Sequence, residues 1–363
     1  MTSNSTSNLD EHLNQILFWI GHFILIIQMV FGTFGNLLNI IIFTRRALRN
    51  NSCSMYFLIV SISNLLEIYI VTLFNHISTS WNWIPANTNI VWCKINGFLT
   101  YPLIALGLWF IVLCSFDRYL TSSHNANIRK KSTLSLAKKM TFSTMLFFFI
   151  IFGHLGIIIR PFTIDDETYC TVLSSTYIIF YNILFVIVGN VLPIILMAIF
   201  GILTVLNIRK IHINVVPLQI NNITSKRIHS KDQQLIRMLL FQVLITVLIS
   251  IPYCCINMYQ TFAQLLLRQH FSSSESAIIY FIDNLLAMIH LTNSVIGFYI
   301  YTLTGHKFRE ELKRCFQYGL KIIFTACYLP LKIQQALFSN KHQRRNHIHP
   351  IEQQQPVVLT TAV

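Results

Sequence analysis

Charged side chains that could form ion pairs within an apolar chain are rare in this sequence, and the most distinctive group is Asp117-Arg118-Tyr119. The triplet ends a long apolar stretch that begins near Cys93. A guanidinium at a membrane boundary is costly unless it is paired, and the neighbouring carboxylate supplies a counter-charge. We therefore expect Asp117 and Arg118 to form an ion pair.

A second group is buried in the apolar stretches themselves. Glu67 is the only acidic residue deep inside one of them, where acids are rare and are usually paired or functional. His290 is its predicted partner. A structural pair is one interpretation of Glu67, and direct contact with a ligand is the other. Polar Asn64, Asn293 and Ser294 are expected to form a neutral hydrogen-bonded core.

The histidines show no pattern typical of a metal site. His22, His76, His154 and His290 are scattered over four apolar stretches without metal-ligand spacing. We predict no metal and no cofactor. The pattern also argues against a membrane metallohydrolase, which would need convergent His and Asp ligands.

The elements that position these residues are membrane helices. The chain of 363 residues is 54% hydrophobic and 11% charged, with a mean hydropathy of +0.57. Its apolar residues fall in long runs, each able to span about 30 Å of hydrocarbon as a helix. These runs are 16–43, 55–77, 94–120, 140–159, 174–208, 235–267 and 277–303. We predict an all-α membrane protein with a seven-transmembrane helix bundle over residues 16–305.

Flanking segments complete the predicted organisation. Residues 1–15 are expected to form an extracellular N-terminus, and no cleaved signal peptide is expected because this segment lacks a basic region. Residues 306–324 are expected to form a short amphipathic cytoplasmic helix. Residues 325–363 are predicted to be a largely disordered cytoplasmic tail.

The distribution of Lys and Arg predicts the orientation. Of the 27 such residues, only Lys94, Arg160 and Arg268 fall in the N-terminus or in the loops after the second, fourth and sixth spans. Positive charge marks the cytoplasmic side, so the N-terminus is outside and the tail inside. The net charge of +14 therefore faces the lipid bilayer and does not indicate a nucleic-acid partner.

This orientation assigns roles to the cysteines and to one asparagine. Cys93 and Cys170 are the only cysteines outside the membrane on the extracellular side, and they are predicted to form a disulfide. Cys315 follows the last span in a basic segment and is a candidate for palmitoylation. Asn4 opens an extracellular N-S-T sequon and is a candidate for glycosylation.

Together these features resemble the rhodopsin-like (class A) G protein-coupled receptors. Asp117-Arg118-Tyr119 lies on the basic side of the third span, as in that family, and Gly35-Asn36 resembles the glycine-asparagine pair of the first helix. Trp83 matches the usual tryptophan of the first outer loop. The segment from Tyr301, Y-T-L-T-G-H-K-F-R-E-E-L, resembles invertebrate peptide receptors of the FMRFamide type.

The resemblance implies a switch at the cytoplasmic side. Arg118 would bridge Asp117 and Asp232 at rest, and outward movement of the sixth helix would free it for a heterotrimeric G protein. Tyr119 and the helix-seven tyrosine Tyr301 belong to the same switch. Asn36 joins Asn64, Glu67, His290, Asn293 and Ser294 in the predicted polar core.

Departures from the family are equally specific. The second-helix aspartate that helps to bind sodium is Asn64 here, and the N-P-x-x-Y motif begins with Gly297. The tryptophan and phenylalanine of the usual helix-six switch are Ser250 and Thr246. These replacements argue against an allosteric sodium site and against the standard switch.

The resemblance also implies an outward-facing ligand pocket. Thr100 stands where amine receptors carry an aspartate, which argues against a biogenic amine. We expect a plasma-membrane receptor for an extracellular peptide or small-molecule ligand, with a neuropeptide favoured. The alternative is a seven-helix transporter or channel, which would show paired intramembrane charges, broken helices and an internal repeat. The candidate pocket residues are Thr100, Tyr101, Ile104, Phe185, Tyr253, Asn257 and Asp283.

Overall fold

The computed structural model describes residues 2–46, 48–81, 85–164, 167–214, 223–265 and 271–328. Only the backbone is described at 2–8, 75, 79–81, 164, 167, 175, 211–214, 223–233, 264–265, 273 and 320–328. Residues 1–309 form one compact unit, and residues 310–363 belong to a second. All the contacts described below for the helix bundle lie within the first unit.

The bundle consists of helices joined by short connections. The elements of its first half are α1 (Thr2–Phe43), α2 (Ser52–Glu67), η1 (Ile68–Thr72), α3 (Leu73–Trp81), α4 (Pro85–Thr88), α5 (Ile90–Ser122), α6 (Ala126–Arg129), α7 (Leu134–Gly153) and α8 (Leu155–Ile158). Those of the second half are β1 (Arg160–Ile164), β2 (Glu167–Thr171), α9 (Ser175–Leu184), η2 (Phe185–Val191), α10 (Leu192–Asn214), α11 (Ile223–Leu265), α12 (Ser273–Leu291) and α13 (Asn293–Thr304). A last helix, α14 (His306–Tyr328), begins in this unit and continues into the second.

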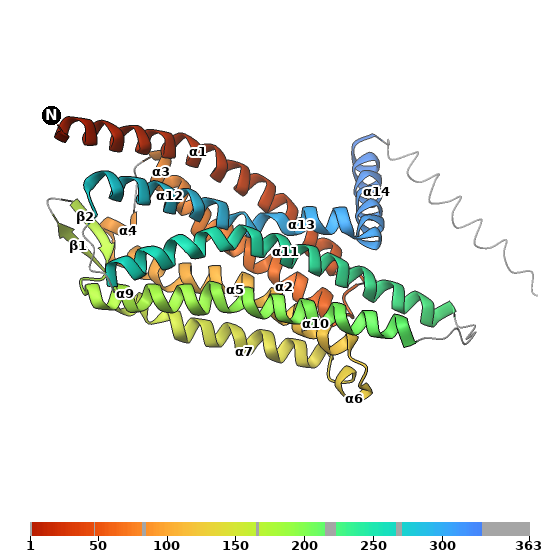
Figure 1. Ribbon diagram of the computed structural model, residues 1–363. Helices are drawn as coiled ribbons and strands as arrows, with labels where there is room; N and C mark the ends of the chain where they lie inside the picture. The colour runs from red at the N-terminus through yellow and green to blue at the C-terminus, as the bar shows by residue number, and fades with distance from the viewer. Residues whose placement is uncertain are drawn as a thin grey trace, which may run out of the picture. The chain divides into compact units, whose positions relative to one another are not determined.

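Seven spans run alongside one another in the bundle (Figure 1). Among the described residues, six helices are long and apolar enough to cross a membrane, and the bent pair α12 and α13 supplies a seventh. The predicted seven-helix architecture is therefore confirmed. The six unbroken spans are Leu9–Phe43, Ser52–Ser78, Ile90–Ser122, Leu134–Ile158, Thr176–Lys210 and Gln234–Ala263.

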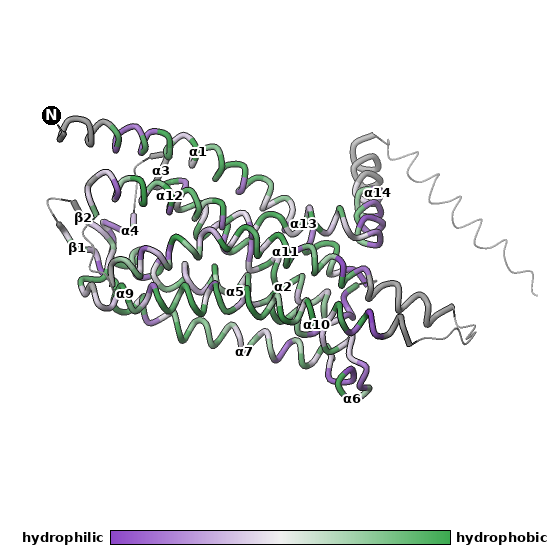
Figure 2. The backbone as a smooth tube through the Cα atoms, viewed as in Figure 1, coloured by the Kyte–Doolittle hydropathy of each residue, from purple (hydrophilic) through white to green (hydrophobic). Residues whose placement is uncertain are grey.

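Helix α5 forms the centre of the bundle. It contacts α2, α7, α10 and α11, and 67% of its most apolar stretch is buried, against 28% for α1 and for the fourth span. The hydropathy colouring shows apolar residues along the helices and hydrophilic residues around α6 and the adjoining end of α10 (Figure 2). The peripheral helices therefore present their remaining apolar surface to lipid, as expected for a membrane bundle.

Short polar side chains begin several of these helices. Asn51 Oδ1 accepts the Cys53 N–H at the start of α2, and Asn89 Oδ1 accepts the Val91 N–H at the start of α5. At α12, Ser272 and Glu275 form a reciprocal capping box. Each cap satisfies backbone donors that lack a partner in the first helical turn.

The seventh span is bent by 41° at Thr292, whereas the sequence predicted unbroken spans. The Thr292 N–H turns to the carbonyl of Ile289, and Gln28 of α1 donates to the Met288 carbonyl (2.7 Å) and to Thr292 Oγ1 (2.9 Å). A carbonyl released from the helical ladder inside a membrane needs such a partner. The side chain of Gln28 thus stabilises the bend.

Two spans also contain π-helical turns. The second span has one at η1, directly after Glu67, and the fifth has one at η2, directly before Leu192-Pro193. Proline cannot donate a backbone hydrogen bond, so the helix must adjust upstream of it. Asn190 Nδ2 donates to the Phe185 carbonyl (3.3 Å) within η2 and satisfies one of the displaced groups.

The loop after the fourth span forms an antiparallel hairpin. The sequence did not predict this hairpin. Strands β1 and β2 pair with Arg160 opposite Thr171 and Pro161 opposite Cys170. The first helix also begins earlier than the predicted span, which starts at residue 16, since α1 starts at Thr2 within the segment predicted as the extracellular N-terminus. The amphipathic segment after the bundle is helical as α14, which extends four residues beyond the predicted end at residue 324.

Candidate functional site

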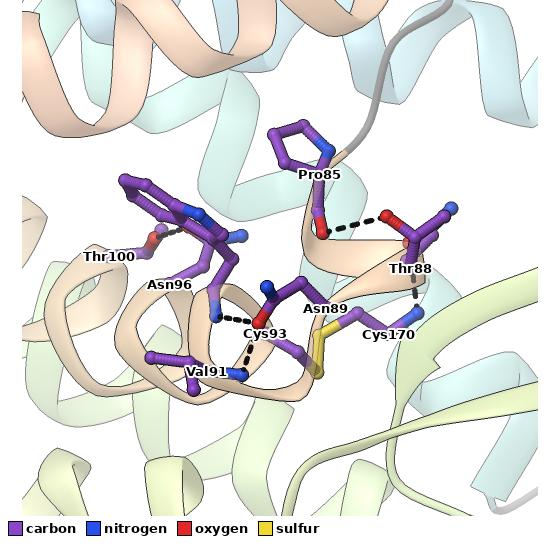
Figure 3. The surroundings of a disulfide bond; sticks show 10 residues. Pro85, Thr88, Asn89, Val91, Cys93, Asn96, Thr100 and Cys170 are labelled. Atoms are coloured by element: carbon purple, nitrogen blue, oxygen red, sulfur yellow. Dashed lines mark hydrogen bonds between the residues drawn. A yellow bond between two sulfur atoms is a disulfide. The ribbon is translucent and has the colours of Figure 1, made fainter.

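The extracellular end of the bundle is tied together at the start of α5 (Figure 3). Cys93 and Cys170 form a disulfide with their Cα atoms 5.6 Å apart, which joins α5 to strand β2 and confirms the predicted bond. The Cys170 N–H also donates to Asn87 Oδ1 (3.0 Å). The hairpin is therefore held against α4 and α5 by one covalent bond and one hydrogen bond.

A cavity of about 300 Å³ lies among the outer halves of the helices. Five predicted pocket residues line it, and they come from the third, fifth and sixth spans: Thr100, Tyr101, Ile104, Phe185 and Tyr253. The second and seventh spans complete the wall with Val71, Phe74, Ser78, Ala287, His290 and Leu291. This size and mixed lining suit a ligand group rather than a single ion.

Aromatic contacts shape one side of the cavity. The Tyr101 ring packs edge-on against Tyr181 (4.8 Å between centroids) and Phe185 (5.0 Å). Across the cavity, Tyr253 of α11 stacks on His290 of α12 at 4.8 Å. Edge-to-face and offset pairs of this kind stabilise a fixed ring arrangement.

Two predicted pocket residues do not line the cavity but contact each other. Asn257 Nδ2 donates to Asp283 Oδ1 (3.2 Å), which joins α11 to α12. Asn257 also donates to the Tyr253 carbonyl (3.0 Å), one turn closer to the cavity. The Asp283 carboxylate is half-buried and keeps acceptor capacity for a further donor.

The buried Glu67 does not form the predicted pair with His290. Within the described residues, His290 Nδ1 lies 3.5 Å from Asn293 Nδ2, and Glu67 makes no hydrogen bond or ion pair with His290. Glu67 instead approaches α5 at Gly107, where a Cβ atom would lie 3.6 Å from Glu67 Oε2 and 3.3 Å from Asn64 Oδ1. The missing side chain at Gly107 gives both polar groups room against the central helix.

The remaining residues of the predicted polar core connect neighbouring helices. Asn36 Nδ2 donates to the carbonyls of Gly32 and Ser294, both at 2.8 Å, and so links α1 to α13. Asn293 Nδ2 donates to Ser250 Oγ (3.1 Å), and Ser294 Oγ donates to the Leu291 carbonyl (2.7 Å). Ser250, at the position of the usual tryptophan, therefore binds the seventh span.

Two further links hold the sixth span, one to the end of the seventh span and one to the start of α14. Tyr301 Oη donates to Gln242 Oε1 (2.5 Å), and both side chains are fully buried. The Lys307 N–H donates to Gln234 Oε1 (3.0 Å) near the cytoplasmic start of the sixth span. The Tyr301 ring packs among Phe43, Phe57 and Phe308 at centroid distances of 4.7 to 5.9 Å.

The predicted ion pair between Asp117 and Arg118 is present, and both residues are buried. Asp117 also accepts hydrogen bonds from Ser52 Oγ (2.8 Å) of α2 and from Ser132 Oγ (2.5 Å) in the loop after α6. Arg118 donates to Ser52 Oγ (3.3 Å). One carboxylate thus joins the third span, the second span and an intracellular loop around the guanidinium.

Several predictions fall where the structure gives no test. The side chains of Asp232 and Asn4 lie outside the described residues, as do Trp83 and residues 329–363. The bridge from Arg118 to Asp232, the glycan at Asn4 and the disordered tail remain predictions. Cys315 is half-buried in α14, and its palmitoylation also remains a prediction.

Sequence reasoning missed four side chains that the structure places in the helix contacts: Gln28, Ser52, Gln234 and Gln242. The glutamines carried a signal, since a polar side chain within or at the edge of an apolar span must find a partner. Ser52 gave no such signal in the sequence, because a serine at a helix start is ordinarily interpreted as part of a helix cap.

Comparison with known proteins identifies the family. The family described as 7 transmembrane receptor (rhodopsin family) matches residues 35–301, which is most of the chain. The match begins within the first span, includes the second to the sixth and ends within the seventh. The chain belongs to this family. The atypical chemokine receptor 2 of Mus musculus is 33% identical over 96 residues, which cover 26% of this receptor and 24% of its relative. The match thus spans about a quarter of that protein.

Family membership decides among the functional classes. The receptor is a multi-pass membrane protein of a non-enzyme family, so the membrane hydrolase is set aside, and so is the transporter or channel. The bend in the seventh span does not revive the transporter interpretation, because hydrogen bonds from Gln28 satisfy its backbone locally. The closeness to FMRFamide-type receptors is not shown by these matches.

Proposed function

We propose that this receptor binds an extracellular neuropeptide in the cavity lined by Thr100, Tyr101 and Tyr253 and activates a heterotrimeric G protein. The observation that carries the proposal is that the sixth and seventh spans both line the cavity, through Tyr253 and His290. His290 lies beside Asn293, which donates a hydrogen bond to Ser250 and so links the two spans. A ligand that contacts Tyr253 and His290 touches both of those spans at once. It can therefore bias their relative position.

The chemistry of the outer surface favours a peptide with a basic group. Thr100 supplies no carboxylate for a small amine in the cavity, and it donates instead to Asn96 Oδ1 (2.7 Å). Asp283 presents its carboxylate beside Asn257. Because a peptide is longer than an amine, a basic group on the peptide would reach Asp283 while another residue of the same peptide fills the cavity. The partial relative is named as an atypical chemokine receptor.

Activation is proposed to run through the sixth span. Its contacts with the seventh span through Ser250 and Gln242, and with the start of α14 through Gln234, hold it in the resting position. Movement of the sixth span away from these partners would expose the buried Arg118 side chain to the cytoplasm. The guanidinium would then leave Asp117 for the G protein.

The test is a screen of synthetic C-terminally amidated peptides in cells that co-express a promiscuous G-protein α subunit, read out as calcium release. An active peptide is then applied to membranes carrying purified heterotrimer, and nucleotide exchange is measured. We expect Arg118→Ala to abolish stimulated exchange and Tyr101→Ala to weaken peptide binding. Undiminished exchange by Arg118→Ala at equal surface expression would contradict the proposed coupling. Peptide-dependent ion flux without exchange would favour a channel.

A further inference from the structure

A groove on the outside of the bundle is separate from the ligand cavity. It lies between the cytoplasmic halves of α10 and α11, has a volume of about 410 Å³ and is lined almost entirely by aliphatic side chains. The one charged residue in its lining is Arg209, next to the cytoplasmic end of the fifth span. The groove is thus apolar along its length and cationic at one end.

The groove opens toward the bilayer. Ile202, Leu206 and Leu244 in its wall are 60%, 45% and 55% exposed, and all three lie within membrane-spanning segments. Its floor is lowered by Gly201, where a Cβ atom would meet only Leu240 Cδ2, at 3.5 Å. A larger side chain at this position would occupy the groove.

The lining decides the chemistry of the occupant. Water has no polar partner along the aliphatic walls, so a hydrocarbon chain is the group that fills them. Lipid chains are as apolar as Leu, however, and this part of the contact does not select one lipid over another. Selection must come from the charge of Arg209, whose side chain can extend to the headgroup level and bind the lipid phosphate. Every phospholipid offers that phosphate, but a headgroup with net negative charge is attracted more strongly than a zwitterionic one, in which a quaternary amine offsets the phosphate.

We propose that an anionic phospholipid of the cytoplasmic leaflet occupies this groove, with one acyl chain between α10 and α11 and its phosphate at Arg209. The neighbouring Lys210 is also exposed but does not line the groove. It adds to the general attraction of anionic lipid without contacting the bound molecule. Since the sixth span borders the groove, a bound chain would also affect how closely that span packs on the fifth.

The full-length receptor is placed in phosphatidylcholine vesicles that contain a trace of phosphatidylserine with a photoactivatable acyl chain. Adducts are mapped by mass spectrometry and compared with those from the same probe on a phosphatidylcholine headgroup. We expect adducts on the segments containing Ile202, Leu206 and Leu244, with about fivefold more from phosphatidylserine. This ratio corresponds to about 1 kcal/mol, the contribution of one basic side chain near a membrane surface.

Three variants separate the site from surface charge. Arg209→Gln should bring the ratio of phosphatidylserine labelling to phosphatidylcholine labelling close to one. Lys210→Gln, the matched control, should keep most of the preference for phosphatidylserine. Gly201→Leu should reduce labelling by both probes in the groove. If it fails to fold, the comparison of Arg209→Gln with Lys210→Gln still decides the question. Equal labelling of the unmodified receptor by both headgroups, or equal effects of the two charge variants, would overturn the proposal.

Discussion

Replacing Tyr301 by Phe should raise basal signalling. The Tyr301 hydroxyl donates to Gln242 Oε1, and no other hydrogen bond to the Gln242 side chain is found among the described residues. Removal of one partner of a buried hydrogen bond leaves the other unsatisfied and costs about 1–3 kcal/mol. If the sixth span moves outward on activation, Gln242 regains solvent, so the cost falls on the resting state alone. The equilibrium should then shift toward the active state by about 5- to 150-fold.

The assay is ligand-free nucleotide exchange by a purified heterotrimer on membranes with matched receptor density. Combining Tyr301→Phe with Gln242→Leu should return exchange toward the original level, because replacing both partners by apolar groups is nearly neutral. Tyr299→Phe is the control, since the Tyr299 hydroxyl donates to the Phe31 carbonyl of α1 and not to the sixth span. The reasoning fails if Tyr301→Phe leaves basal exchange unchanged, or if Tyr299→Phe raises it equally.

Three further predictions concern the outer half of the bundle. Cys93→Ala should lower the free energy of unfolding by about 4.5 kcal/mol because it opens a loop of 77 residues. Thermal unfolding in detergent measures this, and a loss no larger than that of Cys255→Ala would count against it. Glu67→Gln should change peptide affinity by less than about tenfold, since Glu67 does not line the cavity; a larger loss in a binding assay would indicate direct ligand contact. Asp283→Asn should weaken binding of a basic peptide by about fivefold at low salt, and an equal loss for a neutral peptide analogue would refute a charge effect.

Much of the architecture follows from the sequence because membrane spans depend on features that are local along the chain. Runs of apolar residues predict the helices, and the distribution of Lys and Arg predicts their orientation. The disulfide could also be predicted, because the orientation leaves only Cys93 and Cys170 on the oxidising side. The hairpin was missed because residues 160–171 are too short and irregular to show the alternation typical of a strand.

Contacts between helices were harder to predict because they depend on rotations that spacing does not determine. The predicted pair of Glu67 and His290 did not take Gly107 into account. Because Gly107 has no side chain, the Glu67 carboxylate can approach α5 instead. No proline near Thr292 indicates the bend in the sequence. The bend depends instead on a hydrogen bond from Gln28, which is distant along the chain. Such features arise from tertiary contacts. The amino-acid sequence alone therefore shows only that polar groups inside membrane spans must find partners.

The residues that differ from the usual family motifs form hydrogen bonds of their own between the sixth and seventh spans. Tyr253 and His290 stack at the cavity wall, His290 lies beside Asn293, and Asn293 donates to Ser250 on the sixth span. A bulky aromatic switch acts by changing its packing, whereas we propose that this chain of contacts acts by keeping or losing a hydrogen bond. Since the Asn293–Ser250 bond links the two spans directly, a ligand that displaces His290 can weaken it without any large side-chain rotation. Transmission between distant sites requires an element with two alternative arrangements that both sites bias, and these contacts would supply it if the Asn293–Ser250 bond is kept in one state and lost in the other.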